Sequence, residues 1–227
     1  MAEAVDLVVF GASGDLTRRK ILPSLGRLVS REGQSVRVVG AGRTHQTTAD
    51  FRDEVKETSQ NERLSASAEW IQLDYSDPAT FARLKQQVSG SQTVIFYMAT
   101  PPETDSDILA GLALSGLATK NDATRRVVVE KPLGHSLASA HKLNAQLAEA
   151  FAEEQIFRID HYLAKDTVQN VLALRFSNSL FEPVWNRTLI DTILITVAEE
   201  EGIGKRAGYY DQTGAVRDII QNHVLQL

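Results

Sequence analysis

The sequence predicts an α/β fold of the doubly wound Rossmann type, with a mostly parallel sheet followed by the start of an α+β domain. Three observations predict this fold. Short runs rich in Val and Ile recur through the first half, several of them are apolar at consecutive positions, and helix-length segments lie between them. Continuous apolarity is typical of strands covered on both faces, and strands that alternate with helices form right-handed βαβ units.

The elements of the first domain follow in order along the chain. The expected strands are residues 6–11, 35–42, 70–74, 93–99 and 125–131. The first expected helix has an apolar face made of Leu22, Leu25, Leu28 and Val29, and the later ones span 48–60, 77–88 and 104–118. We assign residues 1–158 to a dinucleotide-binding domain of this type.

The pattern changes after residue 136, and we assign 159–227 to the beginning of an α+β substrate domain. One helix is expected with an apolar stripe of Leu137, Ala140, Leu147 and Phe151. "RIDHYLAKD" (158–166) is expected to open a second helix, with Ala164, Val168, Val171 and Leu172 on its buried face. A strand (188–199), a glycine-rich connection (202–214) and a terminal helix (216–227) should follow. Because the chain stops at Leu227 within an expected helix, we expect a fragment with an incomplete second domain.

Composition excludes several classes of function. The net charge of -5 with mixed signs leaves no extended basic surface for nucleic acid. The apolar runs are far shorter than the roughly 18 residues of a membrane span. Without cysteine there is no disulfide or thiolate metal site, and no metal site is expected. A cytoplasmic protein is the resulting expectation.

A glycine loop follows the first strand and leads into a helix. In "FGASGDLTRRK", Gly11 and Gly14 allow a tight turn and close approach to a coenzyme diphosphate. The spacing is G-x-x-G, with Thr17 in place of a third glycine, so a turn without a ligand stays open as an alternative. After the second strand comes Arg43, where an acidic residue would favour NAD. Arg43 favours the 2'-phosphate of NADP, unless it is only a surface arginine.

The fifth strand ends in "VVVEKPLG" (127–134), which places Glu130, Lys131 and Pro132 at the sheet edge where ligands bind. Pro132 can adopt a cis peptide bond there. Five blocks in order, "FGASGDLTRRKILPSL", "EKPLG", "RIDHYLAKD", "LRFSNSLFEPVWNR" and "GYYDQTGAVRDIIQNHVLQ", resemble the glucose-6-phosphate dehydrogenase family. The resemblance covers nearly the whole chain.

The resemblance implies NADP-dependent oxidation of glucose 6-phosphate at C1 to 6-phosphogluconolactone, the first step of the pentose phosphate pathway. It implies that the coenzyme is bound by Gly11, Ala12, Ser13, Gly14, Asp15, Leu16, Thr17, Arg18, Arg43, Asp74, Tyr75 and Lys131. It implies that the substrate is bound by Lys131, His161, Tyr162, Lys165, Glu199 and Asp218. The implied catalytic base is His223, oriented by Asp160. A family-type homo-oligomer is expected only where the C-terminal domain is present.

Residue chemistry agrees with this assignment. If the block is helical from residue 160, His161 and Lys165 lie four residues apart on one face and can converge on a phosphate. Asp160 then points elsewhere and can hold the imidazole of His223.

One departure from the family pattern, and the end of the chain at Leu227 within the expected second domain, keep other interpretations open. The acidic "ETDSDIL" follows "ATPP", where the family usually has an aromatic residue. The alternatives are another Rossmann sugar oxidoreductase with an E-K-P lysine, or a non-catalytic NADP-binding module.

Overall fold

The computed structural model describes residues 5–33, 35–134, 136–160, 162–198, 202, 207–221 and 223–226. The chain divides into two compact units, residues 1–159 and residues 160–227. Each unit has its own elements and its own candidate site residues.

The first unit contains a six-stranded parallel sheet in the order β3-β2-β1-β4-β5-β6. Its strands are β1 Val5–Phe10, β2 Val36–Gly42, β3 Glu69–Gln72, β4 Thr93–Met98, β5 Arg125–Glu130 and β6 Ile156–Ile159. The expected doubly wound fold is confirmed, because the strand order reverses between β1 and β4. The sequence analysis missed β6, which ends inside "RIDHYLAKD".

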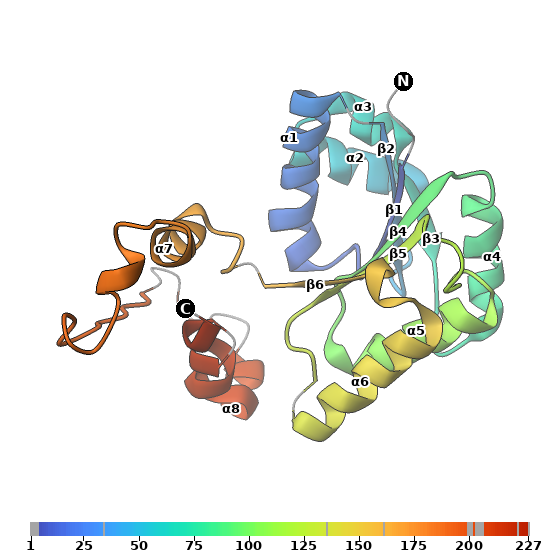
Figure 1. The fold of residues 1–227 in the computed structure, drawn as a ribbon. Helices are drawn as coiled ribbons and strands as arrows, with labels where there is room; N and C mark the ends of the chain where they lie inside the picture. The colour runs from blue at the N-terminus through green and yellow to red at the C-terminus, as the bar shows by residue number, and fades with distance from the viewer. Residues whose placement is uncertain are drawn as a thin grey trace. The chain divides into compact units, whose positions relative to one another are not determined.

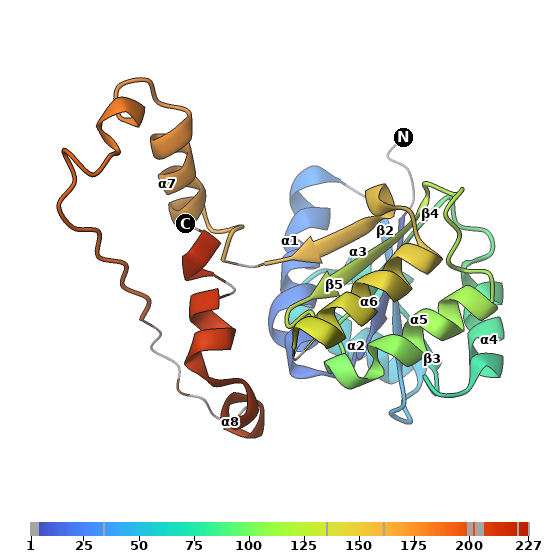
Figure 2. The same ribbon diagram turned by 60° about the horizontal axis from the view of Figure 1, so that its bottom comes forward.

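Helices cover both faces of this sheet (Figure 1). They are η1 Thr17–Ile21, α1 Leu22–Glu32, α2 Thr48–Ser59, α3 Glu62–Ser67, α4 Pro78–Val88, η2 Pro102–Thr104, α5 Asp105–Leu114, α6 Leu137–Ala150 and η3 Glu153–Gln155. Alternate strand residues face opposite helix layers. Val8 and Phe10 pack with α4, α5 and α6, whereas Leu7 and Val9 pack with α1, α2 and α3. Figure 2 shows α4, α5 and α6 side by side along one face.

Local sequence explains where several helices begin. Thr47 accepts a hydrogen bond from the backbone of Asp50, whose carboxylate accepts one in return, so a capping box opens α2. Asp77 caps α4, which has a proline in its first turn. At the other end of α1, Gly33 takes a φ of 63° and ends the helix.

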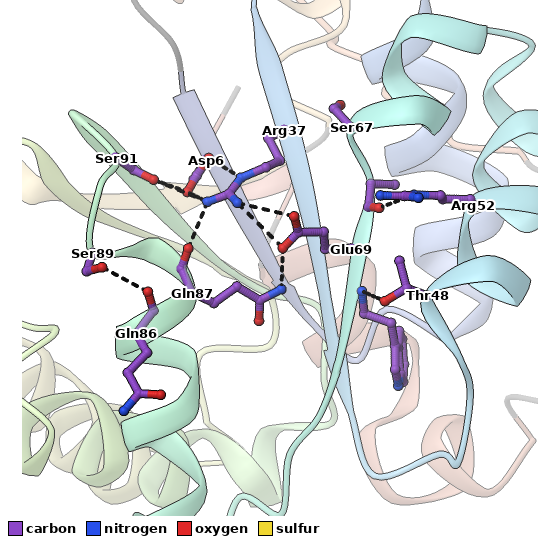
Figure 3. Close-up of polar contacts among 12 residues, drawn as sticks. Asp6, Arg37, Thr48, Arg52, Ser67, Glu69, Gln86, Gln87, Ser89 and Ser91 are labelled. Carbon is purple, nitrogen blue, oxygen red and sulfur yellow. Dashed lines mark hydrogen bonds and ion pairs between the residues drawn. The ribbon is translucent and has the colours of Figure 1, made fainter.

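A charged cluster ties the amino ends of the central strands together (Figure 3). Arg37 on β2 donates to both carboxylate oxygens of its register partner Asp6 on β1. The same guanidinium donates to Glu69 on β3 at 3.4 Å and to the carbonyl of Gln87 at 3.0 Å. Asp6 also accepts from the hydroxyl of Ser91. Because Asp6 is buried, this pairing compensates its desolvation and fixes the register of β1 and β2.

The second unit differs from expectation in four places. Its elements are α7 Asp166–Phe176, η4 Glu182–Val184, α8 Ala207–Ala215, η6 Val216–Gln221 and η7 Val224–Gln226. Residues 162–165 form a turn and the helix begins only at Asp166, so the expected helix from residue 160 is wrong. The expected connection 202–214 is largely the helix α8.

The predicted buried face of α7 and the predicted strand 188–199 are also wrong. Ala164 and Val171 are exposed, Val168 and Leu172 are only half-buried, and no residue of α7 is buried. Residues 188–198 form no strand, and Leu194 in this stretch is 87% exposed. A strand requires a hydrogen-bonded neighbour, and an apolar helix face requires a packing partner. Among the described residues, no strand pairs with 188–198, and α7 buries none of its side chains.

Within the described part of the chain, no helix combines the length and the apolar character needed to cross a membrane.

Candidate functional site

The glycine loop turns directly after β1, at the edge of the sheet where the strands end. Gly11 has a φ of 76°, and a Cβ added there would lie 2.7 Å from the carbonyl oxygen of Ala99 and 2.9 Å from Cγ2 of Thr100. Only glycine fits this position. Gly14 donates its N–H to the carbonyl of Gly11 at 2.8 Å, which closes the turn. Thr17 is buried and donates its hydroxyl to the same carbonyl at 3.3 Å.

Tyr75 holds this loop in place through its hydroxyl. The hydroxyl accepts the N–H of Gly11 at 2.9 Å and lies 3.3 Å from the carbonyl of Ala41, to which it donates. Burial raises the pKa of Tyr75 above its ordinary value. This support role was not predicted, since the resemblance gave Tyr75 only as a residue that binds the coenzyme. A tyrosine after a strand gives no local sign of where its hydroxyl points.

The remaining residues of the predicted coenzyme loop differ in their solvent exposure. Ala12 is buried, Ser13 and Gly14 are half-buried, and Asp15 and Leu16 are exposed. Asp15 pairs with Arg19 at 2.8 Å.

Arg18 pairs with Glu54 of α2 at 2.6 Å, and this hydrogen bond raises the pKa of the guanidinium. Its charge is therefore already partly neutralised by the protein, which weakens the predicted role of Arg18 in binding a diphosphate.

Arg43 lies exposed just after β2, at the same sheet edge as the glycine loop. Its neighbour Thr44 has its hydroxyl oxygen 3.0 Å from that of Ser13, so the two loops are in contact. Asp74, after β3, is exposed and accepts from the N–H and hydroxyl of Ser76, which lowers its pKa. Tight glycine backbone beside an exposed arginine fits a phosphate-bearing dinucleotide.

The E-K-P motif follows β5 at this edge. The Lys131–Pro132 peptide bond is cis, and Lys131 is half-buried. Glu130 accepts a hydrogen bond from the hydroxyl of Tyr97, whose pKa is raised chiefly by burial and further by this carboxylate. The parallel sheet thus brings the segments after β1, β2, β3 and β5 to one edge.

Asp105 is a buried acidic residue that the sequence analysis did not select. It begins α5 and is 7% exposed, and burial, followed by the nearby charge of Glu103, raises its pKa to about 7. It lines a pocket of about 190 Å³ whose other lining residues are Pro102, Glu103, Ser106, Gly134, Ser139, Lys142, Leu143 and Gln146. The sequence feature that could have pointed to Asp105 is the acidic stretch 103–109, which stands where the family usually has an aromatic residue.

Five predicted residues of the second unit are described, and four of them, including the candidate base, form one cluster. His223 is 2% exposed, and its Nδ1 lies 2.8 Å from Oδ1 and 2.9 Å from Oδ2 of Asp160. The ring of Tyr162 stacks on the imidazole with centroids 4.0 Å apart, and Nζ of Lys165 lies 3.7 Å from the Tyr162 centroid. Asp218 is buried within η6.

The helix expected to carry Lys165 does not form at that residue. Residues 162–165 form a turn, and Lys165 is the cap residue before α7. The reason is that β6 continues to Ile159 and the chain turns before the helix. His161 and Glu199 both lie outside the described residues.

Comparisons with known proteins identify the family of this chain. The model of the glucose-6-phosphate dehydrogenase NAD binding domain matches residues 8–170, and that of the C-terminal domain of the same enzyme matches residues 172–227. Glucose-6-phosphate 1-dehydrogenase of Treponema pallidum is 44% identical over 97% of this chain and 47% of its own length. That of Dickeya dadantii is 45% identical over 100% of this chain and 48% of its own length.

Two solved structures are similar over the whole chain. A glucose-6-phosphate dehydrogenase in complex with its substrate glucose-6-phosphate superposes with a TM-score of 0.86 at 32% identity, covering 99% of this chain and 50% of that one. Glucose-6-phosphate 1-dehydrogenase from Mycobacterium avium gives 0.85 at 34% identity, covering 100% and 50%. The chain therefore spans about half the length of the curated relatives it matches. From its Rossmann sheet, its site residues and these matches, the chain belongs to the glucose-6-phosphate dehydrogenase family.

Proposed function

We propose that this chain carries the coenzyme site and the base of an NADP-dependent dehydrogenase that oxidises glucose 6-phosphate at C1 to 6-phosphogluconolactone. The observation that carries the proposal is the buried pairing of His223 with Asp160. The relatives named above support the substrate. They give no support to the other sugar oxidoreductases with an E-K-P lysine.

The pairing sets up His223 as a general base. With Nδ1–H donating to Asp160, the lone pair of the neutral imidazole is on Nε2, and that atom would take the proton of the C1 hydroxyl. The carboxylate stabilises the imidazolium that results. NADP, when bound, supplies the acceptor for the hydride that leaves C1.

The sugar phosphate would be bound by Lys165 and Tyr162, together with His161. Lys165 is exposed, so its ammonium can meet a dianion without prior desolvation. We assign Lys131, Glu199 and Asp218 to the sugar. Binding energy at the phosphate, remote from C1, would then position the reacting atoms.

The coenzyme would be bound by the loop from Gly11 to Arg18, with Arg43 at the 2'-phosphate and Asp74 and Tyr75 near the adenosine. Arg43→Ala should weaken NADP binding about tenfold while leaving NAD binding nearly unchanged, since only NADP carries the extra phosphate. Equilibrium titration with both coenzymes measures this. Arg63→Ala, an exposed arginine on α3, is the control. Equal losses for both coenzymes would contradict the assignment of Arg43.

The activity itself is tested by following NADPH absorbance with glucose 6-phosphate as substrate. We expect turnover in the purified protein and a loss of 10² to 10⁴-fold in kcat for His223→Asn, the usual range for a lost general base. Turnover that is faster with unphosphorylated glucose than with glucose 6-phosphate would sink the proposal.

We also propose a cytoplasmic location, on composition alone, and a homo-oligomer formed through the family's C-terminal domain. Size-exclusion chromatography with light scattering tests the second point.

A further inference from the structure

The ring of Tyr162 lies against the imidazole of His223. The two centroids are 4.0 Å apart and the ring planes differ by 19°. Both side chains are buried, with Tyr162 8% and His223 2% exposed. Two nearly parallel rings at this separation exclude water from the face they share.

The stacking supplies a restraint that the Asp160 contact lacks. A hydrogen bond at Nδ1 fixes one direction of the imidazole, but it allows the ring plane to rotate about the line joining Nδ1 to the carboxylate. A flat aromatic ring against the imidazole face opposes that rotation, because turning the plane would break the stacked contact.

The tyrosine ring is itself held by groups of the same cluster. The N–H of Tyr162 donates to Oδ1 of Asp160 at 2.9 Å, so one carboxylate contacts both the imidazole and the backbone that carries the ring. Nζ of Lys165 lies 3.7 Å from the ring centroid, a cation–π contact. One turn of chain therefore carries Asp160, Tyr162 and Lys165. Asp160 and Tyr162 contact His223, about sixty residues later, and Lys165 contacts the Tyr162 ring.

We propose that Tyr162 is a positioning residue for His223: the stacked ring, and not the hydroxyl, holds the imidazole in the plane from which Nε2 takes the proton. This inference rests on the proposed function of His223. It assigns two separable tasks to one side chain, since the hydroxyl is the group that would contact the sugar phosphate.

Two substitutions separate these tasks. Tyr162→Phe keeps the ring, so kcat should stay within about twofold of the wild-type value while KM for glucose 6-phosphate rises. Tyr162→Leu removes the ring, and kcat should fall about three- to tenfold, the range that corresponds to a lost aromatic pair. Phe181→Leu, a partly exposed aromatic residue of the same unit, is the matched control and should leave both parameters unchanged.

Proton NMR of the His223 ring provides a readout that needs neither substrate nor turnover. In the wild type and in Tyr162→Phe, the ring current of the neighbouring aromatic should displace the His223 resonances from those of an unstacked histidine, with assignment by their loss in His223→Asn. In Tyr162→Leu this displacement should disappear.

The proposal is overturned if Tyr162→Phe loses as much kcat as Tyr162→Leu, or if the wild-type His223 resonances show no ring-current displacement. The second test stands even where the leucine variant fails to fold, because it uses the wild-type protein alone. A protein that does not oxidise glucose 6-phosphate, yet shows the displacement, would refute the proposed function and leave the stacking role of Tyr162 supported.

Discussion

Asp160 and His223 are 63 positions apart in the sequence, and the carboxylate of one meets Nδ1 of the other at 2.8 Å. Replacing Asp160 by Asn removes the negative charge that stabilises an imidazolium while keeping the size of the side chain. We expect kcat to fall by about 10²-fold or more, with a smaller change in KM, because the contact matters most once the proton has moved.

Steady-state kinetics check this expectation. Asp166→Asn, an exposed carboxylate at the start of α7, is the control and should behave as wild type. An unchanged kcat in Asp160→Asn would show that the carboxylate does not support the base.

Alanine substitutions at Gly11 and Gly33 test whether the coenzyme loop has room for a side chain at Gly11. Both have a positive φ, but a Cβ at Gly33 would meet nothing within 4 Å, whereas one at Gly11 would meet Ala99 and Thr100. Gly33→Ala should cost only the roughly 1 to 2 kcal/mol of a left-handed alanine. Gly11→Ala should cost more and should abolish NADP binding.

Urea denaturation measures the first quantity and coenzyme titration the second. Undiminished NADP affinity in Gly11→Ala would place the coenzyme elsewhere.

The buried carboxyl of Asp105 should make stability depend on pH. Its pKa of about 7 in the folded protein is far above the ordinary value of 3.8. Between these values the folded protein retains a proton that the unfolded chain loses. The stabilising contribution is therefore complete below about pH 4 and is lost as pH rises through 7.

Asp105→Asn should be more stable than wild type at pH 8, by at most about 4 kcal/mol, and should show a flatter profile. Urea denaturation at pH 5 and pH 8 measures this difference, with the exposed Asp107→Asn on the same helix as the control. A pH profile in Asp105→Asn that matches wild type would refute the assignment.

Arg37 should be needed for the stability of the sheet and not for chemistry. Arg37→Met leaves the buried Asp6 carboxylate without its ion pair, at a cost of about 2 to 4 kcal/mol. Asp6→Asn should recover part of that loss when combined with Arg37→Met, since no buried charge then remains unpaired.

The exposed Arg126→Met on β5 is the control. Additive effects of the two substitutions, measured in a double-mutant cycle, would exclude coupling between Asp6 and Arg37.

The sequence by itself determined the parallel sheet, the glycine turn at Gly11 and the E-K-P edge at Lys131. These features are local: a strand buried on both faces is apolar at successive positions, and a tight turn requires glycine where it occurs. The pairing of Asp160 with His223 was expected only through family resemblance, because no local pattern connects residues so far apart.

Tertiary structure decided the features that depend on contacts between distant segments. The short strand β6, the hydroxyl of Tyr75 on Gly11, the burial of Asp105 and the stacking of Tyr162 on His223 all depend on which segments pack together. The same dependence explains the wrong prediction of a strand at residues 188–198, where a strand-like apolar sequence forms no strand and is mostly exposed. Apolar alternation gives a segment the capacity to form a strand, but the hydrogen bonds that stabilise it come from a neighbour.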